Sequence, residues 1–255
     1  MSDHRRFPCA PLLALLLLAA PAARAQQILR LAAAADLQPL LPPVLAAFHQ
    51  QTGIDVQPSY KSSANLATAI INGAPFDLFL AADMSFPQRV IDAGKATEPH
   101  PIPYARGTLV LWARNGSGVL SLAGLRSPAI RSIAVANAQH APYGRAAQAT
   151  LDHLHLYAVL QPRLVIAENI AQAAQYADSG NAQVGFISLT SALTPRLRAD
   201  GHYIVVPAQD YPPLIQGAVV IRGSAHAAAA QQFLDFLRSP PIARILAARG
   251  LQPIL

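Results

Sequence analysis

Four segments of this sequence combine small or hydroxyl-bearing residues with the predicted start of a helix. They occupy residues 34–37, 61–65, 141–144 and 168–170, and each comes after a segment that is predicted to be a β-strand. The first turn of a helix leaves backbone N–H groups without partners, and the helix dipole gives them positive character. Such groups bind anions without any charged side chain. Four helix starts that meet at one place would therefore form a site for a small, doubly charged anion.

The side chains in these segments allow more than one interpretation. Ser62 and Ser63 suit the capping of a helix as well as hydrogen bonding to an anion, because serine favours helix starts and turns. Tyr143 and Ile170 would bind through their backbone N–H groups while their side chains pack in the interior. Lys61 is expected to be solvated, with at most a weak steering effect on an approaching anion.

Motifs for catalysis and for metal binding are missing from the sequence. It has no G-x-S-x-G elbow, P-loop, H-E-x-x-H or G-x-G-x-x-G motif. Of the eight histidines only His153 and His155 are close, and two residues apart on a helix they would face different sides. Cys9 is the single cysteine, which excludes disulfides within the chain and thiolate metal sites. We therefore predict a binding protein without a cofactor, and not an enzyme.

Strand and helix patterns alternate along the chain, which favours an α/β fold with mainly parallel sheets. In such sheets ligands bind at the carboxyl ends of the strands, where the four segments lie. Gly53 stands where the first helix should stop, and Asp83 and Ser85 are candidate caps for a later one. Strands are predicted at residues 29–34, 54–60, 76–82, 108–113, 133–136, 164–167, 184–187, 203–206 and 218–221. Helices are predicted at residues 40–48 and 66–70, from near 142 and near 169, and at 225–238 and 241–249.

Two stretches rich in proline and glycine, residues 99–107 and 207–217, bracket the middle of the chain. We interpret them as two crossings between lobes, with plain surface loops as the alternative. The predicted fold therefore has two lobes, each a mainly parallel sheet flanked by helices, joined by a two-crossing hinge. The first lobe would comprise residues 26–105 and 208–255, and the second residues 106–207.

Residues 1–25 have the pattern of a secretory signal peptide. Arg5 and Arg6 precede an apolar run, and the small-residue sequence ARA ends at Ala25. A membrane anchor is the alternative, but the run is shorter than the roughly 20 residues that span a bilayer. We expect export to the periplasm with cleavage after Ala25. An apolar fraction of 53% predicts a globular mature protein, and a net charge of +6 without basic clusters argues against nucleic acid as a partner.

Five segments resemble the periplasmic molybdate-binding proteins that supply ATP-driven importers. They are LAAAADL at residues 31–37, YKSSANLATAIINGAPFDLFLAAD at 60–83, GTLVLW at 107–112, NAQHAPYGRAAQ at 137–148 and GFISL at 185–189. Together they span nearly the whole mature chain, and the Ser-Ser turn and the stretch GAPFDLF are the most distinctive. The resemblance implies a hinged, two-lobed periplasmic binding protein of type II, in which loops of both lobes enclose the anion.

The resemblance also implies which residues contact the oxyanion. By position they are Ala35, Asp36, Ser63, the Tyr143 amide, the Ile170 amide and Ser188. Ser63, Tyr143 and Ile170 would contact molybdate oxygens, and no residue is implied to bind a bare metal cation. At the position of Ser188 some members use a tyrosine hydroxyl to contact the ligand. The serine side chain is shorter, so its hydroxyl does not extend as far toward the ligand.

The first of these loops departs from the family pattern, because a hydroxyl residue or an asparagine is common where Ala35 and Asp36 stand. An ionised carboxylate in contact with a dianion is repelled by it. With an effective dielectric constant near 20, the repulsion is roughly 4 kcal/mol for each unit of ligand charge. We therefore expect Asp36 to turn away and cap its own helix, so that main-chain N–H groups face the ligand.

These inferences predict a periplasmic solute-binding protein that captures molybdate or tungstate. It would act as a monomer and deliver the ion to the membrane permease of an ABC importer. One alternative is the binding of another small anion, an organic acid or an iron complex, although the tyrosine, histidine and carboxylate clusters of ferric sites are not evident. A second alternative is a periplasmic hydrolase with Ser63 as nucleophile, for which no motif supplies a base.

Overall fold

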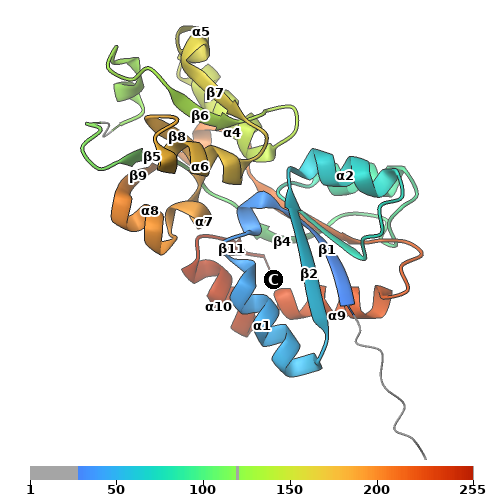
Figure 1. Ribbon diagram of the computed structural model, residues 1–255. Helices are drawn as coiled ribbons and strands as arrows, with labels where there is room; N and C mark the ends of the chain where they lie inside the picture. The colour runs from blue at the N-terminus through green and yellow to red at the C-terminus, as the bar shows by residue number, and fades with distance from the viewer. Residues whose placement is uncertain (1–27, 119–120, 255) are drawn as a thin grey trace, which may run out of the picture.

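The computed structural model describes residues 28–118 and 121–254, which form two lobes around separate sheets (Figure 1). The predicted signal peptide, its cleavage site and Cys9 lie outside the described residues. In the first lobe the strand order is β11-β4-β10-β3-β1-β2. Its strands are β1 (Ile28–Ala34), β2 (Asp55–Lys61), β3 (Leu78–Ala81), β4 (Ile102–Arg106), β10 (Ile215–Val220) and β11 (Gln252–Pro253). Its helices are η1 (Ala35–Leu37), α1 (Leu41–Thr52), α2 (Ser63–Ile71), α3 (Ser85–Asp92), α9 (Ala227–Leu237) and α10 (Pro240–Ala248).

The second lobe contains a five-stranded sheet in the order β7-β6-β8-β5-β9. Its strands are β5 (Leu109–Arg114), β6 (Ile133–Ala136), β7 (Leu164–Ala167), β8 (Val184–Ser188) and β9 (Gly201–Val205). Its α-helices are α4 (Pro142–His153), α5 (Tyr157–Leu160), α6 (Ile170–Ser179), α7 (Leu189–Ala192) and α8 (Pro195–Asp200). Three short 3-10 helices are η2 (Ala123–Arg126), η3 (Gln161–Arg163) and η4 (Ala208–Asp210).

Strand β1 shows why helices cover both faces of the first sheet. Leu29, Leu31 and Ala33 share a core cluster with α1, α9 and α10, whereas Ala32 packs with α2 and α3 in another. Successive side chains of a strand point to opposite faces, so a strand with buried apolar residues on both faces needs a helical layer on each side. Helix α1 ends, as predicted, at Gly53, whose φ of 71° is left-handed and favours glycine.

The sheets are mixed, so the expectation of mainly parallel sheets holds only for the strands that carry the predicted site. Strand β1 is parallel to β2 and β3, and β6 is parallel to β7 and β8. Strands β10 and β5 pair antiparallel with their neighbours, because they are the strands by which the chain re-enters one lobe and enters the other. The parallel halves place their carboxyl ends, and the helix starts that follow, toward the other lobe.

The stretches predicted as loop crossings are partly strand. Strand β4 lies within residues 99–107 and β10 begins at Ile215. Pro103 is tolerated in β4 because it lies beside the register shift between β4 and β10, where Tyr104 is the extra residue and a missing N–H disturbs the ladder least. Only Gly107 and Thr108 separate β4 from β5. The lobe boundaries near residues 105 and 207 stay a prediction.

None of the helices in the part of the chain that the structure describes is long and apolar enough to cross a membrane.

Candidate functional site

A small pocket lies where the two lobes meet. Its cavity volume of about 10 Å³ is far below the roughly 300–1,000 Å³ of pockets for drug-sized ligands, which excludes a ligand of that size in this arrangement. Its lining residues come from both lobes: Ala34, Ala35, Asp36, Lys61, Ser62, Ser63, Ala82, Ala141, Pro142, Tyr143, Asn169 and Ile170. The structure therefore brings together five of the six residues expected at the site, and the starts of α2, α4 and α6 with them.

Helix α2 gives its two serines different tasks. The Ser62 hydroxyl caps the helix by accepting the N–H of Asn65 at 3.4 Å. The Ser63 hydroxyl instead accepts the N–H of Ala82, at the end of β3, at 3.1 Å. Because its lone pair is used in this way, the Ser63 O–H is free to donate into the pocket.

Helices α4 and α6 approach the pocket from the second lobe. Asn169 caps α6 through its side chain, which accepts the N–H of Gln172 at 3.0 Å. No acceptor contacts the N–H groups of Ser63, Tyr143 and Ile170 within residues 28–118 and 121–254. Buried N–H groups without partners are rare in proteins. Three of them around one pocket indicate a ligand that accepts hydrogen bonds.

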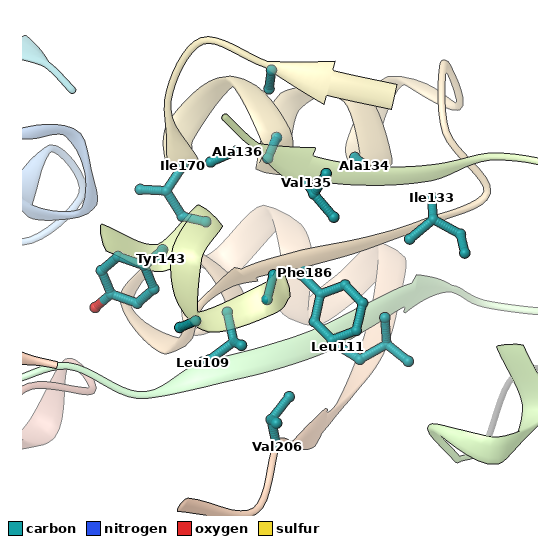
Figure 2. Close-up of a cluster of buried hydrophobic side chains, with 14 of the residues drawn as sticks. Leu109, Leu111, Ile133, Ala134, Val135, Ala136, Tyr143, Ile170, Phe186 and Val206 are labelled. Carbon is teal, nitrogen blue, oxygen red and sulfur yellow. The ribbon is translucent and has the colours of Figure 1, made fainter. Parts of the chain in front are cut away.

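The side chains of Tyr143 and Ile170 belong to the core of the second lobe. Figure 2 shows both beside Leu109 and Ala136, with the Tyr143 hydroxyl directed away from the cluster. This hydroxyl donates to Asp36 Oδ2 at 3.2 Å. Burial and the nearby Asp36 raise the pKa of Tyr143 well above its usual value, so the hydroxyl stays protonated.

Asp36 lies on η1 and is completely buried. The expectation that it caps its own helix is wrong, because its Oδ2 accepts from the Tyr143 hydroxyl and, at 2.5 Å, from Gln216 Nε2. Its Oδ1 has no partner among the described residues. Desolvation by burial raises the pKa of Asp36 from 3.8 to about 6, although its hydrogen bonds lower it.

Ser188 does not line the pocket. Its hydroxyl caps α7 by accepting the N–H of Ser191 at 3.2 Å, and it lies 2.8 Å from the Thr190 hydroxyl. Thr190 in turn donates to the main-chain carbonyl of Asp36 at 2.7 Å. Ser188 therefore reaches the site only through Thr190, in agreement with its short side chain.

Contacts around the pocket hold the lobes together in a closed arrangement. The N–H of Ala64 donates to the His140 carbonyl at 3.1 Å, and Asn65 Nδ2 donates to Glu168 Oε1 at 3.0 Å. Arg145 on α4 forms an ion pair with Asp83 at the end of β3. The starts of α2 and α4 thus meet directly, as Figure 1 also shows.

Several residues that shape the site are not identified from the sequence. Gln216 lies beside the register shift between β10 and β4, inside a stretch predicted to be a loop. The side-chain amide of Gln216 donates to Asp36. The signal that could reveal it is a single glutamine between apolar residues and glycine in the sequence LIQGAVVI. Thr190 carries no such signal, and Asp83 is predicted as a helix cap but not as the partner of Arg145.

Comparisons with known proteins agree with this geometry. The family model for bacterial extracellular solute-binding proteins matches residues 29–252. The chain is 35% identical over 233 residues to a molybdate-binding protein of Rhodobacter capsulatus, covering 91% of this chain and 90% of the relative. It is 34% identical over 234 residues to a molybdate-binding protein of Azotobacter vinelandii, covering 91% and 92%. A solved structure of the periplasmic molybdate-binding protein of Azotobacter vinelandii superposes with a TM-score of 0.83 at 33% identity, covering 89% of this chain and 99% of that one.

Proposed function

Because this chain belongs to the family of bacterial extracellular solute-binding proteins, we propose that its interlobe pocket holds molybdate or tungstate for uptake. The observation that carries the proposal is the set of three N–H groups that have no acceptor among the described residues and that both lobes contribute to one small pocket. The Ser63 hydroxyl adds a fourth donor. Ala35 and Asp36 complete the lining, and Ser188 supports it indirectly.

The binding cycle uses the contacts between the lobes. An open form admits the oxyanion, and closure brings the α2 donors toward those of α4 and α6. The contacts from Ala64 to His140 and from Asn65 to Glu168 then form around the ligand. A ligand that contacts both lobes favours the closed form through its higher affinity for that form. The closed shape is what a membrane permease of an ABC importer would recognise, in the periplasm, after removal of residues 1–25.

The alternative of a serine hydrolase finds no support in the surroundings of Ser63. A nucleophilic serine needs a base within hydrogen-bonding distance of its hydroxyl. Within the described residues, the contact of the Ser63 hydroxyl is the N–H of Ala82. We therefore propose binding without bond chemistry.

Selectivity should follow from ion size. Molybdate and tungstate differ little in size, whereas sulfate is smaller and would leave some fixed donors without partners. Each unmade hydrogen bond costs about 1–3 kcal/mol. We predict that molybdate and tungstate raise the unfolding temperature of the mature protein strongly, and that sulfate, phosphate and chromate do so weakly. At a hundred times its dissociation constant a ligand adds about 2.7 kcal/mol to the free energy of unfolding.

A thermal-shift panel of these five anions, followed by titration calorimetry, measures this effect. Sodium chloride at matched ionic strength is the control for screening. A strong response to another anion with none to molybdate or tungstate would falsify the proposed ligand.

The two serines of α2 should differ in their effect on binding, although both substitutions lower stability, because Ser63→Ala leaves the buried N–H of Ala82 without its acceptor. Ser63→Ala removes a donor to a charged ligand, worth about 1.5–3 kcal/mol, so molybdate affinity should fall about tenfold to a hundredfold. Ser62→Ala removes a helix cap and should lower the free energy of unfolding by about 1 kcal/mol with a much smaller loss of affinity. Calorimetry and urea denaturation of both variants test the distinction. Equal losses of affinity would show that Ser63 acts only through the helix.

A further inference from the structure

Asp36 is the one acidic residue among those that line the pocket. Its side chain is completely buried, and Oδ2 is held by Tyr143 and Gln216. Oδ1 has no hydrogen-bond partner in the described part of the chain. A buried carboxyl oxygen without a partner is costly when it is charged, and it calls for a proton or a donor.

The groups that face Asp36 do not neutralise it. Tyr143 from α4 and Gln216 from β10 are uncharged donors, and Tyr104 of β4 is a second buried tyrosine near the carboxyl group. From α7 the Thr190 hydroxyl contacts only the main-chain carbonyl of Asp36. Lys61, the cation in the lining, is exposed, and no ion pair involves Asp36 among the described residues.

A dianion in the pocket changes the state that this carboxyl group prefers. In the closed form without an anion, burial already raises the pKa of Asp36 from 3.8 to about 6, so the carboxyl group of this form is mostly ionised at neutral pH. A second negative charge in the same pocket raises the pKa further, since like charges disfavour ionisation. The bound state is then protonated at a pH where the free state is not.

We propose that Asp36 takes up one proton from the solvent with each oxyanion that binds, and carries it on Oδ1. The inference rests on the proposed function, because it needs a dianion in this pocket. The charges balance, because a doubly charged oxyanion, an ionised carboxylate and one proton form a complex with two negative charges. No covalent bond to the ligand forms.

Proton uptake makes Asp36 a determinant of affinity as well as a lining residue. An asparagine here would be a neutral donor at every pH. With aspartate, molybdate affinity should fall as the pH rises above neutrality, by up to about tenfold per pH unit when one proton is bound with the ligand. The protein would thus hold its ligand most tightly under mildly acidic conditions.

Titration calorimetry with molybdate at about pH 7.5, in two buffers of different ionisation enthalpy, counts the protons directly. We expect close to one proton taken up per molybdate by the wild type, and close to none by Asp36→Asn. Asp92→Asn removes an exposed carboxylate on α3 and should behave like the wild type. Thermal unfolding of each anion-free variant verifies that it is folded, and the wild-type proton count stands without any variant.

The outcomes separate the two proposals. Tight molybdate binding by the wild type, with no proton uptake and with constant affinity from about pH 6 to about pH 9, overturns the role of Asp36 and leaves the proposed function intact. Failure of both molybdate and tungstate to bind anywhere in that range overturns the proposed function itself.

Discussion

Asp36→Asn should stabilise the anion-free protein at pH 8 by up to about 3 kcal/mol, because it removes a buried charge. The folded-state pKa of Asp36 is raised from 3.8 to about 6, so between these values the folded protein binds more protons than the unfolded chain. The contribution of Asp36 to the free energy of unfolding of the wild type is therefore fully present below about pH 4, and it is lost as the pH rises through 6. The asparagine variant has no such loss.

Urea denaturation of wild type and variant at about pH 4.5 and about pH 8 measures the effect as a difference between the proteins, which removes the contribution of other carboxylates. The amide oxygen that the substitution introduces can still accept from Tyr143 and Gln216. Asp92→Asn is the matched control. If the difference in the free energy of unfolding between wild type and Asp36→Asn did not change with pH, burial would not disfavour the ionised form of Asp36.

Gly144→Ala should both destabilise the protein and weaken molybdate binding by about a hundredfold or more. A Cβ atom at this position would clash with the Ala136 carbonyl oxygen and lie 2.8 Å from the carbonyl carbons of Ala136 and Asn137. These are backbone atoms at the end of β6, so the start of α4 must move instead. The Tyr143 amide and hydroxyl would move with it. The amide would then lose its hydrogen bond to the charged ligand, and the hydroxyl would lose its hydrogen bond to Asp36.

The loss of stability expected for Gly144→Ala is about 1–3 kcal/mol, as for other overpacked positions. Gly124→Ala is the control, since its added Cβ would make only an ordinary contact of 3.5 Å with Ser121. Calorimetry and denaturation of both variants give the comparison. Unchanged affinity in Gly144→Ala would show that the position of α4 does not matter for the ligand.

Local signals explain why the helix starts around the site are predictable from the sequence. Pro142 and Asn169 mark the beginnings of α4 and α6, and the structure places these helices where expected. The signals work because caps and proline act within one turn of the chain. The gathering of Ser63, Tyr143 and Ile170 in one pocket follows from the parallel strands that precede them.

The surroundings of Asp36 depend instead on contacts between distant parts of the chain. Gln216 is 180 residues away and Tyr143 is 107 residues away. A local rule for aspartate near a helix start favours capping, and tertiary contacts override it here. The same holds for β4 and the start of β10, where proline and glycine suggest loops but sheet pairing decides the conformation.

A crystal structure of the mature protein with molybdate, with the anomalous signal of molybdenum recorded, tests the central claim most directly. The account predicts one peak in the interlobe pocket, with oxygens within about 3 Å of the Ser63 hydroxyl and of the Tyr143 and Ile170 amide nitrogens. A peak elsewhere, or a molybdenum atom bonded directly to a protein side chain, would contradict it.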